Sequence, residues 1–66
     1  MIITINGQPA ELADGATTAA AVRLLTSASS GIAVAVNGEV VRRGAWESTP
    51  LAEGDDVEVL TAVQGG

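Results

Sequence analysis

The chain has 66 residues, 47% of them apolar, and carries a formal net charge of −5 with a pI near 4.1. A chain of this length forms one small domain that buries only about 60% of its extended surface. It has no cysteine and no histidine, which excludes disulfides, thiolate metal sites and most general-base catalysis. The acidic balance makes nucleic acid and anionic membranes poor partners, whereas a protein with a basic docking surface fits well.

The sequence also contains no lysine, so it offers no ε-amine that could attack an activated carboxyl group. No apolar run reaches 18 residues, and no basic segment precedes an apolar one. We therefore expect a cytoplasmic protein that does not bind membranes.

The first half of the chain predicts a hairpin followed by a helix. Residues 1–5 are rich in strand-forming isoleucines. Asn6-Gly7 is typical of a type I′ turn, because both residues tolerate positive φ. Residues 8–12 would return as a second strand, which Pro9 restricts to the edge of a sheet.

Helix signals follow at Thr17 and Thr18, either of which can serve as the N-cap of a helix that runs to about Ala28. Gly31 then ends the helical segment, since glycine accepts the left-handed conformation. The expected apolar face, with helical spacing, consists of Ala21, Val22, Leu25 and Ala28.

The second half predicts three strands. The solid apolar run 32–36 indicates a central strand, and Asn37-Gly38 is a second type I′ signal that returns residues 39–42 as the next strand. Residues 44–50 are expected to be irregular, and residues 57–62 alternate as a final strand.

The order ββαβββ predicts an α+β fold of the ubiquitin-like β-grasp type, a mixed sheet of about five strands packed on one helix. The first and last strands would pair in parallel at the centre, because each must lie under the helix. We expect residues 1–62 to form the domain and residues 63–66 to form a flexible C-terminal tail.

The last strand runs directly into Val63, Gln64, Gly65 and Gly66. Two terminal glycines place a carboxylate on a tether without side chains, which suits a narrow active site of another protein. Four extended residues reach at most about 14 Å. The Gly66 carboxylate is thus the leading candidate for the reactive group.

Three segments resemble the ThiS family, the sulfur carrier proteins of thiazole biosynthesis. They are residues 3–7, residues 34–46 and residues 51–60, and the terminal Gly-Gly agrees with them in place. Arg42 departs from the family pattern, which usually has proline there.

This resemblance implies a carrier that is not itself an enzyme and binds no cofactor. Its Gly66 carboxylate would be adenylated with ATP by an E1-like adenylyltransferase of the ThiF type. Sulfur from a donor such as a cysteine persulfide enzyme would then replace AMP, giving a thiocarboxylate. A thiazole synthase of the ThiG type would accept that sulfur. Val63, Gln64 and Gly65 would thread into each partner.

Docking of these partners requires a surface on the domain. Alternation in the last strand points Leu60 and Ala62 away from the helix, with Ala33 and Ala35 on the same face and Glu58 at its rim. We expect this apolar patch to bind both enzymes. Scattered exposed apolar residues are the alternative interpretation.

Other residues have structural interpretations. Trp46 would cap one end of the core, Arg42 and Arg43 would pair with nearby acids, and the acidic turn 53–56 would be solvated without a bound metal. Other functions remain open: a sulfur carrier for molybdopterin, cysteine or secondary metabolism, a ubiquitin-like modifier of proteins, or an interaction domain with an inert tail.

Overall fold

The computed structural model describes residues 1–27 and 30–61. Their elements in chain order are β1 (Ile2–Ile5), β2 (Gln8–Glu11), α1 (Thr18–Leu25), β3 (Ile32–Val36), β4 (Glu39–Val41), the 3-10 helix η1 (Arg43–Ser48) and β5 (Asp56–Thr61). The predicted order of strands and helix is confirmed, with η1 as an addition.

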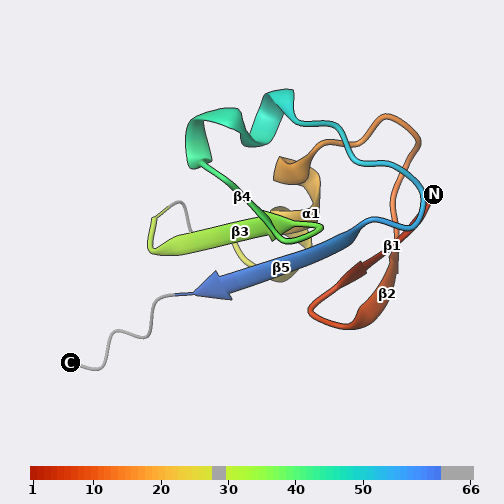
Figure 1. The fold of residues 1–66 in the computed structure, drawn as a ribbon, viewed down its shortest axis with the longest axis horizontal. Helices are drawn as coiled ribbons and strands as arrows, with labels where there is room; N and C mark the ends of the chain where they lie inside the picture. The colour runs from red at the N-terminus through yellow and green to blue at the C-terminus, as the bar shows by residue number, and fades with distance from the viewer. Residues whose placement is uncertain (28–29, 62–66) are drawn as a thin grey trace.

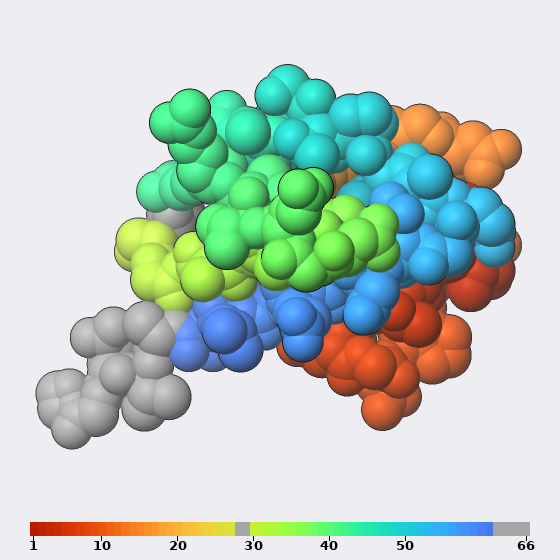
Figure 2. Space-filling view, in the orientation of Figure 1, coloured from red at the N-terminus to blue at the C-terminus, as the bar shows by residue number. Residues whose placement is uncertain are grey.

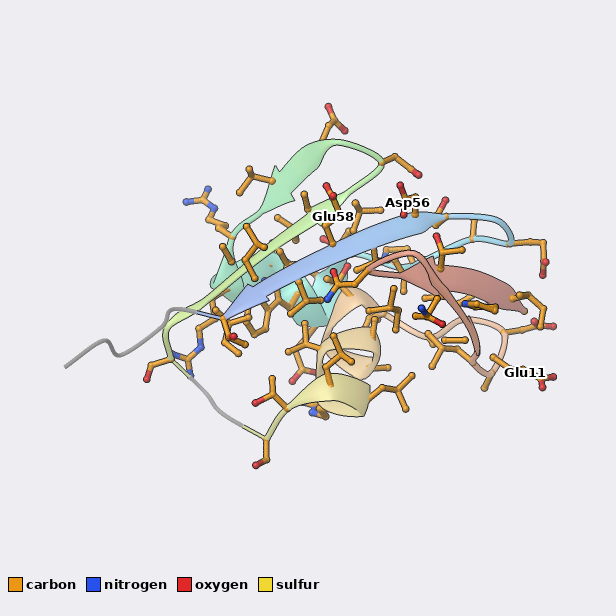
Figure 3. All side chains as sticks on the ribbon, turned by 90° about the horizontal axis from the view of Figure 1, so that it is seen from below. Glu11, Asp56 and Glu58 are labelled. Atoms are coloured by element: carbon orange, nitrogen blue, oxygen red, sulfur yellow. The ribbon has the colours of Figure 1, made fainter. Side chains whose placement is uncertain are left out.

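The five strands form one mixed sheet in the order β2-β1-β5-β3-β4. β1 and β5 pair in parallel, as predicted, and the other three pairings are antiparallel. Helix α1 packs against one face of this sheet, and none of the described residues forms a helix on the opposite face (Figures 1 and 3). This arrangement is the β-grasp fold, with β5 as the central strand.

Both hairpins turn at Asn-Gly pairs. Asn6 and Gly7 have φ of 52° and 81°, and Asn37 and Gly38 have φ of 51° and 84°. These positive values are what a type I′ turn requires, which explains why asparagine precedes glycine at each turn. Pro9 lies on β2, an outer strand of the sheet, so its missing N–H disrupts no inner ladder.

Helix α1 ends three residues before the predicted end at Ala28, which lies outside the described residues. Thr26 is the C-cap in an extended conformation (φ −156°, ψ 148°), and its N–H bonds the Val22 carbonyl. Thr26 and Ser27 are weak helix formers, which accounts for the early end. Because the helix stops there, Leu25 is 50% exposed and does not join the core face.

The core lies between α1 and the sheet. Trp46 is only 7% exposed, and its Nε1–H donates to the Val41 carbonyl at 2.9 Å. Residues 44–50 are therefore not simply irregular, because η1 positions this indole at one end of the core as predicted. The buried apolar residues are Ile3, Ile5, Ala19, Ala21, Val22, Val34, Trp46, Leu51, Val57 and Val59.

Strand β3 confirms one inference from the sequence. Its apolar run predicts a central position, and β3 is an inner strand that lies between β5 and β4. Val34 is buried under α1, but Ala33 on the other face is exposed. Both faces of this strand are therefore apolar, although the face opposite α1 forms surface and not core.

Candidate functional site

The candidate site begins on β5, where alternation divides the side chains between two faces. Val57 and Val59 are buried under α1. Glu58 and Leu60 are exposed, and Figure 3 shows Glu58 on the side of the sheet away from α1. Leu60 is 68% exposed, so its predicted place outside the core is confirmed.

Strand β3 brings the predicted alanines beside these residues. Ala33 pairs with Leu60 and Ala35 pairs with Glu58. Ala33 is exposed and Ala35 is half-buried. The structure therefore brings together four of the five residues predicted for docking; the fifth, Ala62, lies outside the described residues.

Sequence reasoning missed Val40. It pairs with Ala35 and is 82% exposed, more than any other large apolar side chain described. The signal was present, because the Asn37-Gly38 turn fixes the hairpin register and hence the face on which Val40 lies. We call Ala33, Ala35, Val40 and Leu60 the open apolar face.

A small hollow of about 100 Å³ lies in this face, between the exposed Val40 and Leu60 side chains. Strands β3, β4 and β5 form one continuous surface here (Figure 2). A second, shallower depression adjoins it at the end of β5. The hollow is lined by Ala33, Val34, Ala35, Val40, Glu58 and Leu60.

The two turn asparagines anchor β5 in the sheet. The Asn6 side chain accepts from the Val59 N–H at 2.8 Å and donates to the Val59 carbonyl at 3.1 Å. The Asn37 side chain accepts from the Asp56 N–H at 3.0 Å and donates to the Asp55 carboxylate at 3.0 Å. The amides therefore continue the ladders beyond the ends of β1 and β3.

The acidic turn before β5 makes structural hydrogen bonds. Asp55 accepts from the Ala52 N–H at 2.8 Å, and Glu53 accepts from the Ile2 N–H at 2.9 Å. Within residues 1–27 and 30–61, no three acidic side chains gather closely enough to hold a metal ion.

The pairing predicted for the neighbouring arginines is wrong. In the part of the chain that the structure describes, neither Arg42 nor Arg43 forms an ion pair. Arg43 instead lines a cleft between η1 and α1. The third arginine, Arg23, bonds Glu47 at 2.8 Å with both side chains largely exposed.

The predicted reactive tail, Val63, Gln64, Gly65 and Gly66, lies outside the described residues. The structure does place its point of attachment. Strand β5 ends at Thr61, at the opposite end of the molecule from the N-terminus (Figure 1). No helix among the described residues is long and apolar enough to cross a membrane.

The sheet has a helix on one face, an open second face, and β5 as its central strand. These features together define a ubiquitin-like β-grasp protein. The sequence profile of the ThiS family matches residues 3–66, nearly the whole chain. The chain belongs to the ThiS family.

Solved structures agree with this assignment. The crystal structure of thiamine biosynthesis protein ThiS from Geobacter metallireducens superposes with a TM-score of 0.78 at 33% identity, over 100% of both chains. An NMR structure of a thiamine biosynthesis protein from the same organism gives a TM-score of 0.76 at 33% identity, over 100% of this chain and 88% of the other. A search of curated proteins gave no match.

Proposed function

We propose that the chain is a sulfur carrier for the thiazole moiety of thiamin. The observation that carries this proposal is the ThiS family match, which extends from residue 3 through the two terminal glycines. The solved relatives named as thiamine biosynthesis proteins support the same pathway. In this role the chain is a protein substrate and does not catalyse a step itself.

The chemistry would occur at the Gly66 carboxylate. Its oxygen attacks ATP in an E1-like adenylyltransferase of the ThiF type, which forms an acyl-adenylate and releases pyrophosphate. A persulfide sulfur then attacks the acyl carbon, and the bond to AMP breaks. Reduction of the resulting S–S bond by a thiol leaves a thiocarboxylate. A ThiG-type thiazole synthase accepts this sulfur.

The described side chains explain why this carrier needs enzymes. It has neither cysteine nor histidine, and among the residues described no three acidic side chains gather closely enough to hold a metal ion. A carboxylate is a poor electrophile until a leaving group replaces its oxygen. The domain contributes a recognition surface. A partner enzyme that binds this surface receives the tail next to the place where it is docked.

The open apolar face is the surface that we assign to this recognition. It lies next to the end of β5, so a partner docked there stands where residues 62–66 begin. Ordering the tail costs about 1–2 kcal/mol per residue, which docking must offset. Leu60 and Val40 offer the largest apolar area for that purpose.

Intact-mass spectrometry tests the carrier function. The protein is incubated with ATP, the E1-like enzyme of the same organism and a cysteine persulfide donor. The expected product is heavier by the difference between one sulfur and one oxygen. Deletion of Gly66, or addition of one alanine after it, should abolish the change while leaving the domain folded.

Other outcomes favour other functions. Wild-type protein that releases no pyrophosphate with the E1-like enzyme would contradict both the carrier and the modifier. Conjugates on lysines of other proteins would indicate a ubiquitin-like modifier. A thiocarboxylate that thiazole synthase cannot use, but another sulfur acceptor can, would place the carrier in a different sulfur pathway.

A further inference from the structure

Arg42 stands on the open side of the sheet. It directly follows β4, whose last residue, Val41, packs against the core. The Arg42 backbone is extended (φ −69°, ψ 155°), so alternation turns its side chain to the face opposite Val41. Val41 pairs with Val34, which puts the next position, residue 42, beside Ala33 and one strand from Leu60.

Acidic side chains occupy the other part of the same face. Glu58 and Asp56 precede Leu60 by two and four residues along β5, or about 7 and 14 Å. Figure 3 shows both carboxylates on the side away from α1, whereas Glu11 lies apart on the outer strand β2. The face is therefore positive near the end of β5 and negative farther back, with the apolar hollow between.

Arg42 is the cation available for this face. Arg23 is held by Glu47, and Arg43 lines the cleft against α1 on the other side of the sheet. The Arg42 side chain is exposed and has no hydrogen bond or ion pair within the described residues. Its carbonyl accepts from the Ala45 N–H at 2.8 Å, a backbone contact that does not depend on the side chain.

We propose that Arg42 makes the open apolar face a directional docking site for the adenylating enzyme. The enzyme presents a carboxylate to Arg42, an aliphatic side chain to the hollow, and basic groups to Glu58 and Asp56. This inference rests on the proposed carrier function and adds the charge pattern that its first partner must have.

Direction follows from the charge order. An enzyme docked on this face in the reverse orientation would place its acidic group over Glu58 and its basic groups over Arg42. Juxtaposed like charges disfavour such a complex and slow its formation. In the favoured orientation, the acidic contact of the enzyme lies nearest the end of β5, where the tail departs. A second copy of this chain is a poor occupant, because each copy carries a net charge of −5.

Two adjacent substitutions separate this contact from a general charge effect. Arg42→Glu and Arg43→Glu change the net charge equally, but they act on opposite sides of the sheet. We expect Arg42→Glu to lower kcat/KM for ATP-dependent pyrophosphate release by about tenfold at low salt, because a rim charge acts mainly on association. The loss should shrink as salt screens the contact. Arg43→Glu should stay within about twofold of wild type.

Arg42→Gln serves as a milder variant that retains an extended polar side chain, and Trp46 fluorescence reports whether each variant is folded. An intermediate loss for Arg42→Gln supports the proposal. Equal effects of Arg42→Glu and Arg43→Glu at every salt concentration would overturn it, as would no effect of either. Wild-type protein that dimerises through this face in sedimentation experiments would also overturn it.

The same assay distinguishes failure of the carrier function from failure of the Arg42 contact. If wild-type protein releases no pyrophosphate, the carrier function itself fails. If wild type reacts normally and the two arginine variants behave alike, only the directional contact fails.

Discussion

At the scale of single residues, the turn asparagines do more than permit a turn. Positive φ explains why Asn6 and Asn37 precede glycines. Their side-chain amides then bond the backbone of β5, a strand far away in the sequence. The central strand is thereby held beyond the point at which its neighbours turn away.

Asn6→Gly tests this role while retaining the backbone conformation, since glycine also accepts a φ of 52°. We expect a loss of about 1–2 kcal/mol in the free energy of unfolding, because the variant leaves the backbone N–H and carbonyl of buried Val59 without their protein partner. Urea denaturation followed by Trp46 fluorescence measures it.

Asn37→Gly is the matched control. It carries the same glycine entropy in the unfolded chain, but the bonds that it removes are exposed. Its loss should therefore be smaller than that of Asn6→Gly. Equal losses in the two variants would show that glycine entropy, not the Val59 contact, sets the cost.

At the scale of elements, short segments obtain their shape from packing. Segment 43–48 has no helical apolar spacing, yet it forms η1 because Trp46 is drawn into the core. Thr49 supports it, with its hydroxyl donating to the Ala45 carbonyl at 2.7 Å. Helix α1 shows the opposite case, in which local propensity decides the length. The weak helix formers Thr26 and Ser27 end it before Ala28, the last residue of its expected apolar face.

Trp46→Phe tests how η1 is held. The ring stays apolar, but the hydrogen bond from Nε1 to the Val41 carbonyl disappears. Together with the smaller volume, this should cost about 1–3 kcal/mol of unfolding free energy. Thermal unfolding followed by circular dichroism should show a lower Tm, by about 4–8 °C per kcal/mol for a domain of this size. An unchanged Tm would mean that η1 does not depend on this contact.

At the scale of the whole molecule, one helix covers one face of the sheet and leaves the other free. Within residues 1–27 and 30–61, α1 is the one α-helix, and it leaves that face uncovered. Its exposed side chains can therefore change with little effect on the fold, and we assign them to partner binding.

Leu60→Glu tests this division between stability and binding. Leu60 is 68% exposed, so the variant should unfold at nearly the wild-type denaturant concentration. Adenylation by the E1-like enzyme should fall about tenfold or more in kcat/KM, because a charge would enter an apolar contact. Pyrophosphate release measures the rate.

Leu24→Glu is the matched control, with the same change in charge at a side chain that is 56% exposed on α1. It should leave the adenylation rate within about twofold of wild type. A Leu60→Glu variant that fails to fold would instead assign Leu60 to the core. Equal rate losses in the two variants would place binding elsewhere.

Local patterns account for much of what the sequence predicts. The two Asn-Gly turns, the edge position of Pro9 and the alternation in β5 each rest on residues close in the chain, and all agree with the structure. Alternation also predicted the face of the sheet on which Leu60 lies, and Ala33 shares that face as expected. The proposed role of Gly66 also rests on residues close in the chain, and it stays a prediction.

Only the tertiary structure decided the rest, because it depends on contacts between distant residues. Pairing of β5 with both β1 and β3 set the full strand order β2-β1-β5-β3-β4. The same pairing set Val40 beside the predicted docking residues and left Arg42 without the acidic partner that proximity in sequence suggested. The sequence by itself predicted the candidate reactive group and the fold, whereas packing across the sheet determined the surface formed by β3, β4 and β5.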